Sequence, residues 1–506
     1  MNSRDVSALK DNLAHHPSKL SPITFLDWAV LGFVIVSGTV LRLAYFDQPM
    51  RADEAYTYTE FASRTAYDAV SLYTFPNNHL FHTLLVHITV KLFGPASWVI
   101  RTPALLAGIA LIPATFALVR RLADTRSGLL AAALIASSDT LVSYSANARG
   151  YTLLCLITLL FILVADRVSS EKKTRDWLAF LILPALGFFT IPIMLYPMAG
   201  VVCWIGLRRL AGITKGPRLD RLFTALVVSG LLTITFYVPT FFRTGVGSVV
   251  SNSFVKPRAF DDLRRELPAS LALVWYQWNL DLPRPVALGF IGFWAIALFS
   301  PSPGRRGVRV MTGLTLTLFV ASLAIVFCQR VIPFDRVWIF LAPLYLATMA
   351  TGLSSLLTKG CERRPRASRT VETALPVIIA LVFGLFVWRS PAIPLEASKL
   401  TVNEAPALVR RLAGELKPND GVITELPCDG PLRYYMMLNG LGIEPLHDFR
   451  VQQASRLFLV VNRPSGQTVQ SVLEANSIRL PAESAPRLVE DFGRSALFVI
   501  EARVSN

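Results

Sequence analysis

Charged side chains are scarce in this chain of 506 residues. Only 17% of the residues are Asp, Glu, Lys or Arg, whereas 53% are hydrophobic and the mean hydropathy is +0.48. Soluble globular domains contain about 25% charged residues, so this composition excludes an ordinary soluble protein. The sequence therefore predicts a polytopic α-helical membrane protein.

Cysteine is also rare, and its distribution excludes two kinds of site. The five cysteines lie far apart in the sequence, at Cys155, Cys203, Cys328, Cys361 and Cys428. Neither a disulfide framework nor a CxxC metal site fits this spacing. We expect these residues to be small buried hydrophobic side chains.

A cleavable signal peptide is not apparent. Residues 1–20 are polar, and no A-x-A-like site follows the first apolar run, which extends from Thr24 to Phe46. That run is long enough to cross a bilayer. We expect it to stay in the membrane as the first anchor, after a cytoplasmic tail of residues 1–23.

Acidic residues are outnumbered by basic residues, 34 to 50, which gives a formal net charge of +16. The basic residues fall in short clusters between apolar runs, as the positive-inside rule of membrane proteins describes. A nucleic-acid partner is therefore not needed to explain the charge.

Eleven apolar runs approach the length of about 20 residues that a membrane span requires. They cover residues 24–46, 98–119, 127–145, 151–166, 177–190, 191–207, 222–243, 285–300, 309–328, 336–357 and 371–388. Five basic loops should be cytoplasmic: residues 120–126, 166–176, 208–221, 304–309 and 358–369. The alternation then puts loops 47–97 and 244–284, and the chain after residue 389, on the outer side.

Two segments of the first outer loop have the pattern of helices that lie along the membrane surface. Residues 77–94 are apolar, but counting them as a span would invert every later loop. Their polar side chains recur every three to five positions, at His79, His82, Thr83, His87 and Lys91. Residues 54–73 form a second interfacial segment of this kind.

The composition changes after Trp388 to that of a small soluble domain, residues 391–506. Amphipathic helices are expected at 405–416, 431–440 and 468–477, and strands at 421–427, 456–461 and 495–502. This order favours a three-layer α/β sandwich. The domain has no GxGxxG or GxxxxGK[ST] motif, so a nucleotide site is not supported.

The first outer loop contains adjacent carboxylates, Asp53 and Glu54, in the stretch "RADEAYTYTE". Carboxylates favour a helix N-terminus, so the pair fits a solvated helix start. An Asp ionised at neutral pH can also act as a general base. A pair of divalent-metal ligands is a weaker reading, because adjacent residues on a helix point about 100° apart. The residues alone leave these readings open.

Three of the six histidines fall between residues 79 and 87, and His79 with His82 has a spacing that can share a metal. A zinc site needs three or four ligands, and no Cys or carboxylate lies at a matching helical position nearby. Donors at the level of the lipid headgroups are the alternative reading.

Two further outer turns contain arginines. In "SYSANARGYTL", Arg149 and Tyr151 fit either interfacial anchoring or phosphate binding. In "CQRVIPFDRVW", Arg330 precedes Asp335 and Arg336, which fit a structural ion pair as well as a binding site. Asp139, inside an apolar run, should face the protein interior, because a carboxylate is costly in lipid.

Taken in order, several motifs resemble the GT-C membrane glycosyltransferases. The motifs are "RADEAYTY", "PNNHLFHTLL", "WVIRTPALLAG", "RRLADTRSGLLAAALIAS" and "YSANARGYTLL". The resemblance is clear over residues 24–165, and is to bacterial relatives of the protein O-mannosyltransferases and of the aminoarabinose transferase that modifies lipid A. It implies a GT-C-like transmembrane catalytic domain over residues 24–390, with a polyprenyl-phosphate sugar donor and an outward-facing site.

The resemblance also implies roles for single residues. Asp53 matches the family's base, and Glu54 the acid that accompanies it. Arg149 matches the Arg of the second outer turn. Relatives have a Glu-Lys or Asn-His pair followed by Pro where this chain has Asn78 and His79, and here Leu80 replaces that Pro. Asp139 stands where relatives often have Pro.

The implied reaction displaces a phosphate at the anomeric carbon of a sugar. A phosphate monoester has a second pKa of about 6, so it can leave without a general acid if preorganised cations stabilise it. The candidate cations are Arg149, Lys256, Arg330 and His79, in that order. Asn78, Tyr151 and His82 are expected to line the substrate pocket. No cofactor is expected, and a divalent metal, although possible, is not supported.

The resemblance thus implies a polyprenyl-phosphate-dependent glycosyltransferase in the bacterial inner membrane, with residues 391–506 in the periplasm. The acceptor hydroxyl would belong to a lipid, a glycan or a protein. A transporter or flippase for a lipid-linked glycan is the alternative function. That alternative predicts broken helices at corresponding positions of two repeats, and no such repeat is visible in the sequence.

Overall fold

The structure is a computed structural model that describes residues 22–74, 76–170, 173–214, 216–250, 256–280, 282–299, 306–361, 365–394, 401–447, 454–479 and 485–501. Residues 1–21, most of the expected cytoplasmic tail, lie outside this set. The chain forms two compact units. Unit 1 comprises Met1–Tyr45, Val70–His82 and Pro103–Ser390, and unit 2 comprises Phe46–Ala69, Thr83–Thr102 and Pro391–Asn506. Unit 2 thus joins two pieces of the first outer loop to the C-terminal part.

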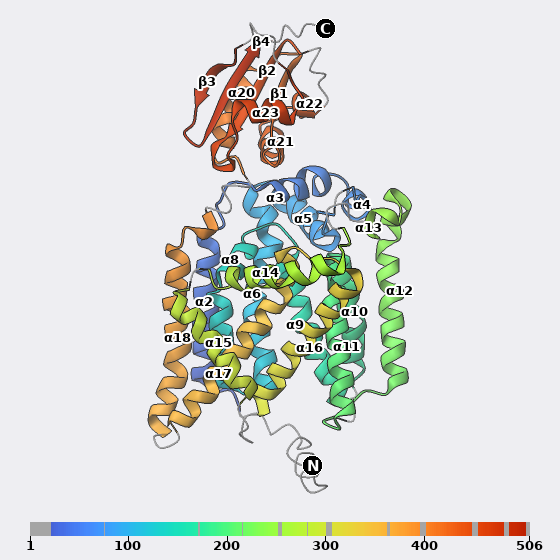
Figure 1. Cartoon of the computed structure of the whole chain (residues 1–506), viewed down its shortest axis with the longest axis vertical. Helices are drawn as coiled ribbons and strands as arrows, with labels where there is room; N and C mark the ends of the chain where they lie inside the picture. Colours follow the sequence, from blue (N-terminus) through green and yellow to red (C-terminus); the bar gives the residue numbers. More distant parts are fainter. Residues whose placement is uncertain are drawn as a thin grey trace. The chain divides into compact units, whose positions relative to one another are not determined.

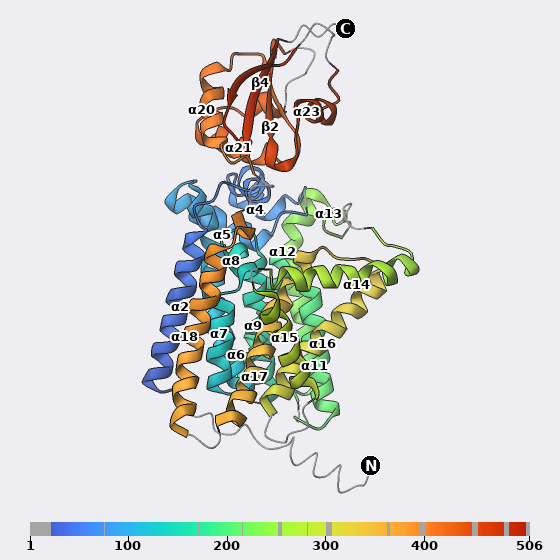
Figure 2. The same cartoon turned by 60° about the vertical axis from the view of Figure 1, so that its left-hand side comes forward.

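Unit 1 is a bundle of helices. Its helices are α2 (Phe25–Ala44), α6 (Ser97–Leu122, which begins in unit 2), α7 (Thr125–Ala136), α8 (Asp139–Ser145), α9 (Tyr151–Ser170), α10 (Thr174–Thr190), α11 (Leu195–Leu210), α12 (Leu219–Thr244), α13 (Gly247–Val250), α14 (Phe260–Gln277), α15 (Arg284–Phe299), α16 (Arg306–Gln329), α17 (Ala342–Cys361) and α18 (Pro365–Arg389), with 3-10 turns η2 (Pro192–Met194) and η3 (Asp335–Leu341). Most long helices run side by side, whereas α14 runs across them (Figures 1 and 2).

The length and composition of these helices confirm a polytopic membrane protein. In the described part of the chain, eight helices are long and apolar enough to cross a membrane, and α7 with α8, bent by 61°, makes up to nine. Two further expected spans, 177–190 and 285–300, correspond to α10 and α15, which have 17 and 16 residues. Both are shorter than the roughly 20 residues of an untilted span.

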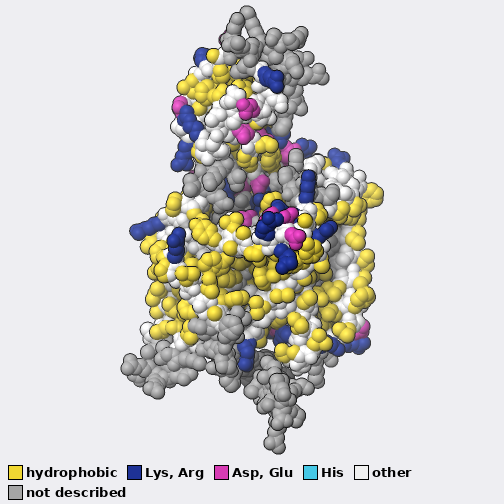
Figure 3. All heavy atoms as spheres, in the orientation of Figure 1, with side chains coloured by type: hydrophobic (Ala, Val, Ile, Leu, Met, Phe, Trp, Pro, Cys, Tyr) yellow, Lys and Arg dark blue, Asp and Glu magenta, His cyan; other side chains and the backbone are white. Residues whose placement is uncertain are grey.

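The outside of unit 1 is apolar where lipid would cover it. On α12, large hydrophobic side chains are exposed along most of the helix: Leu219, Phe223, Val227, Val228, Leu231, Ile234, Val238 and Phe242. Hydrophobic side chains also predominate over the part of the surface formed by the helix bundle in Figure 3. A soluble protein rarely exposes such a continuous apolar surface, so these side chains fit contact with a bilayer.

Basic loops gather at one end of unit 1. Asp166, near the end of α9, accepts hydrogen bonds of 2.7 Å from Arg121 at the end of α6 and 2.7 Å from Arg208 at the end of α11. Arg126, at the start of α7, pairs with Glu372 in α18. The contacts of Asp166 bring three of the five basic regions together, and Glu372 lies three residues after a fourth, 358–369.

The expected span 127–145 is broken between α7 and α8. Arg42, fully buried in the last turn of α2, donates to the carbonyl oxygens of Ala136 (3.0 Å) and Ile135 (3.2 Å), which end α7, and to Ser145 Oγ in α8 (3.1 Å). The last carbonyls of a helix have no hydrogen-bond partner within that helix, so Arg42 supplies the donors for the carbonyls at the end of α7. Asp139 is buried as expected, in the first turn of α8.

The first outer loop forms short helices. They are α3 (Ala52–Tyr56), the π-helix η1 (Thr57–Ala62), α4 (Ala66–Ser71) and α5 (Leu80–Phe93). The expected interfacial helix over residues 54–73 is therefore divided into three pieces. Helix α5 has 14 residues, or about 21 Å at 1.5 Å per residue, which is too short to cross the bilayer core upright. Its placement along the membrane surface stays a prediction.

The C-terminal part of unit 2 confirms the expected α/β domain. Its strands β1 (Asp420–Thr424), β2 (Arg456–Asn462), β3 (Arg487–Asp491) and β4 (Ser495–Glu501) form one sheet in the order β1-β2-β4-β3. Strand β1 is parallel to β2, whereas β4 is antiparallel to both β2 and β3. The helices are α20 (Ala405–Glu415), α21 (Asp429–Leu438), α22 (Glu444–His447) and α23 (Val469–Ala475). The sequence did not indicate β3, because most of its residues are exposed and polar.

Alternate residues of β2 face two different cores, which makes this domain a three-layer sandwich. Phe458 and Val460 pack in the core that includes Leu408 and Leu412 of α20. Leu457, Leu459 and Val461 pack in the other core, with Val472 and Leu473 of α23. Figure 2 shows α20 and α23 on opposite faces of the sheet.

Close packing of α2 against α7 predicts a position-specific effect on stability. A Cβ atom on Gly38 would lie 2.8 Å from Ala136 Cβ, whereas nothing lies within 4 Å of a Cβ on Gly32 in the same helix. Gly38→Leu should cost about 1–3 kcal/mol through overpacking and lower the Tm in detergent. Gly32→Leu is the matched control and should leave the Tm unchanged. Equal Tm values for both variants would contradict the observed packing.

Candidate functional site

A group of polar side chains in unit 1 surrounds Arg149, in the turn between α8 and α9. The Arg149 side chain donates a hydrogen bond to Asn77 Oδ1, and its guanidinium carbon lies 5.6 Å from the centre of the Tyr151 ring. The His79 ring meets Tyr151 edge-on at 5.0 Å. Arg149 and His79 are only 3% exposed. We call Asn77, His79, Arg149 and Tyr151 the Arg149 cluster.

The turn that holds this cluster requires glycine at position 150. A Cβ atom on Gly150 would lie 2.7 Å from Thr190 Cγ2 and 3.2 Å from His79 Nδ1. The backbone N–H of Gly150 donates to His79 Nδ1 at 2.8 Å. The close approach of this backbone therefore fixes both the position and the orientation of the imidazole.

The hydrogen bond from Gly150 also determines where His79 holds its proton. A neutral imidazole has one N–H, and Nδ1 accepts a hydrogen bond, so the proton is on Nε2. Nε2 lies 3.4 Å from Nη2 of Arg149. An imidazole N–H and a guanidinium are thus side by side, and both groups are donors.

Burial and charge keep His79 neutral. Burial lowers the pKa of His79 well below its usual 6.5, and the charges of Arg149, His82 and Arg336 lower it further. Burial also raises the pKa of Tyr73 to about 12, against the opposing charge of Arg149. The Arg149 cluster therefore holds its positive charge on arginine, with neutral donors around it.

The two other residues predicted near His79, Asn78 and His82, are both buried. Asn78 is buried and donates from Nδ2 to the carbonyl of Leu72 at 2.6 Å. Helix α5 begins at Leu80, the position where relatives have Pro, so the helix start does not depend on proline here. His82 is fully buried in the first turn of α5, where its charge would act on His79.

Lys256 and Arg330 belong to a different part of unit 1. Both are exposed, and their segments are joined by a hydrogen bond from Arg258 N–H to the carbonyl of Arg330, at 2.7 Å. Arg330 has φ of 54°, a left-handed conformation that is uncommon for a non-glycine residue.

The two adjacent carboxylates of unit 2 have different environments. Asp53 is partly exposed, whereas Glu54 is fully buried. Glu54 accepts two hydrogen bonds from Arg101, at 2.8 Å to Oε1 and 2.7 Å to Oε2, and one of 3.1 Å from the backbone N–H of Arg51. A carboxylate in this position is a poor general base, because its charge is already bound and it has no access to solvent.

Arg101 organises the segment that precedes α3. Besides Glu54, its guanidinium donates to the carbonyls of Phe46 (2.7 Å), Gln48 (2.7 Å) and Pro49 (3.1 Å). In the sequence, Arg101 stands within the motif "WVIRTPALLAG", which alone did not indicate its role. The available signal was a charged residue within an apolar helix, because Arg101 lies in the first turns of α6.

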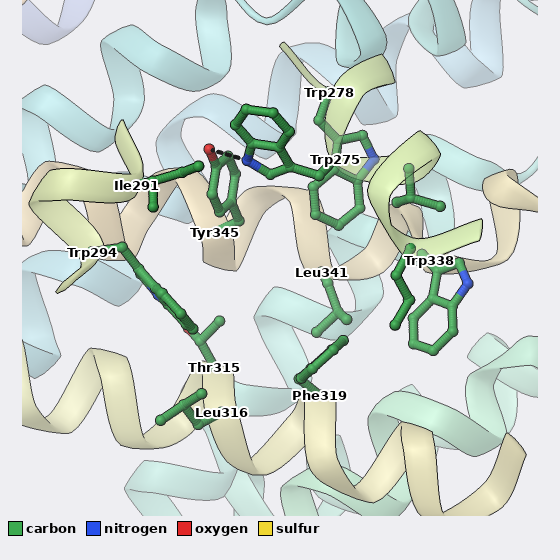
Figure 4. Close-up of a pocket in the computed structure, with 12 residues that line it drawn as sticks. Trp275, Trp278, Ile291, Trp294, Thr315, Leu316, Phe319, Trp338, Leu341 and Tyr345 are labelled. Atoms are coloured by element: carbon green, nitrogen blue, oxygen red, sulfur yellow. Dashed lines mark hydrogen bonds between the residues drawn. The ribbon is translucent and has the colours of Figure 1, made fainter. Parts of the chain in front are cut away.

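A cavity of about 290 Å³ in unit 1 is lined almost entirely by apolar and aromatic side chains. Trp275 comes from α14, Trp278 directly follows α14, Trp294 comes from α15 and Tyr345 from α17, and all four surround the cavity in Figure 4. Trp275 Nε1 donates to the Tyr345 hydroxyl at 3.2 Å. The sequence indicated the aromatic residues of loop 244–284 but not this cavity, because α15, α16 and α17 complete it.

Within the residues that the structure describes, no group of three or more His, Cys, Asp or Glu side chains is arranged to hold a metal ion.

The buried pair predicts that Glu54 contributes mainly to stability. Glu54→Gln leaves the charge of Arg101 buried without its carboxylate, and breaking a buried pair in this way costs about 3–5 kcal/mol. The Tm in detergent should fall clearly. Asp53→Asn, at the adjacent and partly exposed position, is the control and should change the Tm little. A wild-type Tm for Glu54→Gln would contradict this role.

The lowered pKa of His79 predicts a pH-dependent stability. The unfolded chain binds a proton at this residue below pH 6.5 and the folded chain does not, so stability falls as the pH decreases below about 6.5. The Tm of the wild type should therefore fall between pH 7.5 and pH 5. In His79→Gln the decrease should be smaller, and parallel curves for the two proteins would exclude this effect.

Three comparisons with known proteins bear on the fold. Residues 78–232 match the family model described as dolichyl-phosphate-mannose-protein mannosyltransferase. A search of curated proteins finds no match. Among solved structures, ArnT from Cupriavidus metallidurans in the apo state has 12% sequence identity and a TM-score of 0.61, over 93% of this chain and 97% of that chain.

Two ligand-bound structures have the same fold. ArnT from Cupriavidus metallidurans bound to undecaprenyl phosphate has 12% identity and a TM-score of 0.59, over 95% of this chain and 99% of that chain. The archaeal oligosaccharyltransferase AglB from Archaeoglobus fulgidus, in complex with an inhibitory peptide and a dolichol-phosphate, has 11% identity and a TM-score of 0.51, over 86% and 69%. These matches show that the chain has the fold of ArnT from Cupriavidus metallidurans and of AglB from Archaeoglobus fulgidus.

Proposed function

We propose that the protein is a glycosyltransferase that moves a sugar from a polyprenyl-phosphate donor to an acceptor hydroxyl at the outer face of the membrane. An anion-binding group, a carboxylate and an apolar cavity suited to a lipid chain support this function. Each contributes one requirement of the reaction.

The observation that carries the proposal is the pair of donors at Arg149 and His79. The Nε2–H of the neutral His79 lies beside the Arg149 guanidinium, and both side chains are buried. A phosphate oxygen bound here would receive hydrogen bonds from a cation and from a neutral N–H. In a site with little water, such preorganised donors stabilise the charge that develops on a leaving phosphate.

Asp53 is the proposed general base. Asp53 is partly exposed, whereas the adjacent Glu54 is fully buried and pairs with Arg101. Among these two carboxylates, only Asp53 is accessible to an acceptor hydroxyl. It would take the proton of that hydroxyl as the oxygen attacks the anomeric carbon, and the phosphate would leave with the electrons of the broken bond. We assign Glu54 a positioning role instead.

The apolar cavity supports a lipid-linked donor. The cavity is lined by the rings of four tryptophans: Trp275, Trp278, Trp294 and Trp338. These rings and the side chains around them form a surface suited to an isoprenoid chain. ArnT from Cupriavidus metallidurans binds undecaprenyl phosphate and AglB from Archaeoglobus fulgidus binds a dolichol-phosphate, which supports the same class of ligand for this chain. The cavity would hold only a few isoprene units of such a chain.

The distribution of charge supports an outward-facing site. Basic loops meet at Asp166 at one end of α9, and Arg149 precedes the other end of this 20-residue helix. If the basic end is cytoplasmic, the Arg149 cluster is on the outer side. Helix α18 starts near the basic end, at the contact of Glu372 with Arg126, so the C-terminal domain would follow on the outer side, in the periplasm of a Gram-negative cell.

Release of polyprenyl phosphate tests the proposal against the alternative of a flippase. Purified protein would be incubated with a lipid extract of its own host, and free polyprenyl phosphate would be measured by mass spectrometry. A flippase moves the lipid-linked glycan without breaking it, so absence of release with every acceptor fraction of the host envelope would support the alternative.

Asp53→Asn should lower the rate of this release by about 10²- to 10⁴-fold, the usual effect of losing a general base. Binding of undecaprenyl phosphate should be unchanged, because Asp53 acts on the acceptor. Asp47→Asn, an exposed carboxylate earlier in the same loop, is the matched control and should keep the wild-type rate. Near-normal turnover of Asp53→Asn would remove the assignment of the base.

A further inference from the structure

The C-terminal domain is in direct contact with the segment that carries Asp53. Within unit 2, helix α21 packs against both α3 and the π-helix η1. The approach is close, since a Cβ atom on Gly430 would lie 3.1 Å from the carbonyl oxygen of Ala52 and 3.5 Å from Ala55 Cβ. Glycine at the start of α21 thus allows the two backbones to meet beside Asp53.

Two pairs of polar side chains join α21 to α3 and η1, at the same residue spacing on both sides. The Tyr56 hydroxyl lies 2.6 Å from each carboxylate oxygen of Asp429, and Arg433 pairs with Glu60. Tyr56 and Glu60 are four residues apart, and so are Asp429 and Arg433, so each helix presents both groups on one face. Burial and the Asp429 carboxylate raise the pKa of Tyr56, which therefore remains a donor.

The chain before Asp53 is held by the same domain. Thr401 donates from its hydroxyl to the carbonyl of Met50 at 2.5 Å, and the backbone N–H of Met50 lies 3.4 Å from the Tyr435 hydroxyl. Tyr434 meets Tyr58 edge-on, with 5.7 Å between the ring centres. Residues on both sides of Asp53 thus contact the C-terminal domain.

We infer that the C-terminal domain, through α21, positions Asp53 for proton transfer from the acceptor. Tyr56, Glu60, Asp429 and Arg433 are then positioning residues, which act through α3 and η1 and do not touch the reacting atoms. The inference rests on the proposed function, in which Asp53 is the base. The C-terminal domain would then take part in turnover itself, so recruitment of partner molecules is not needed to explain its presence.

The π-helix indicates why such external support is needed. The N–H of Ser63 donates to the carbonyl of Tyr58 at 2.9 Å, five residues back, and η1 keeps this wide geometry over Thr57–Ala62. π-Helical turns are rare, less stable than α-helix and frequent at functional sites. Contacts from α21 on Tyr56, Tyr58 and Glu60 hold the segment in this form. A displaced base loses rate steeply, and an error of about 1 Å can cost 10²-fold.

Charge reversal across the interface provides the test. Arg433→Glu places a carboxylate against Glu60, and Glu60→Arg places a guanidinium against Arg433 and near Arg64. In the full-length protein, each single variant should lower kcat for polyprenyl phosphate release by about 10²-fold. The Kd for undecaprenyl phosphate should not change. The double variant restores an opposite-charge pair and should recover most of kcat.

A second ion pair of the same domain offers a matched control. Arg463 and Asp491 are paired at 2.8 Å in the C-terminal domain, and both side chains are about half exposed. Arg463→Glu makes the same charge change as Arg433→Glu but at a pair that does not involve α3 or η1. It should leave kcat within about twofold of the wild type, as expected for an exposed pair.

The outcomes separate this inference from the proposed function. If Asp53→Asn turns over normally, the assignment of the base fails and the inference fails with it. If Asp53→Asn is inactive but Arg433→Glu keeps its kcat, or if the double variant does not recover, only the inference is overturned. Should the charge reversals fail to fold, Tyr56→Phe removes one hydroxyl and retains the ring. A lowered kcat with an unchanged Kd for undecaprenyl phosphate would then support the inference, and a wild-type kcat would overturn it.

Discussion

The buried ion pair between Glu54 and Arg101 is the interaction on which the geometry of the first outer loop depends. One guanidinium binds both oxygens of Glu54 and three carbonyls of the segment that precedes α3. A charge this deeply buried must have all its donors satisfied, so the loop has little freedom to adopt another path. Because adjacent residues on a helix diverge by about 100°, burial of Glu54 directs Asp53 elsewhere.

Burial also divides the polar residues of unit 1 into different roles. In the Arg149 cluster, the low pKa of His79 leaves the positive charge on Arg149 and makes the imidazole a neutral donor with a defined tautomer. Lys256 and Arg330 remain in solvent, where a single charge has a smaller effect on a bound anion. The chemistry of the cluster therefore depends on packing around Gly150 and Thr190 as much as on residue type.

The sequence predicted features that depend on local pattern. The apolar runs and basic loops predicted the helices and their grouping, and the alternating helices and strands predicted the C-terminal sandwich, with α21 ending just before Gly440 (φ 69°) as expected. Local patterns could not predict contacts between residues that are distant in the sequence. Glu54 and Arg101 are 47 residues apart, and His79 meets Gly150 at a separation of 71. The regular spacing of His79, His82 and His87 indicated one polar stripe, whereas His79 precedes α5 and His87 contacts the carbonyl of Ala62 in unit 2.

The arginine at the end of α2 has a consequence for how the protein is made. Arg42 leaves the ribosome before its partners, because the carbonyls that it binds belong to residues synthesised more than 90 positions later. Until α7 is inserted, the guanidinium has to reach water at the membrane surface, which an arginine near a helix end can do with its long side chain. Assembly of the broken span α7–α8 therefore withdraws a charge from the interface into the bundle. Helix α2 acquires its final rotation and depth only when α7 arrives, so insertion and folding of this protein are coupled events.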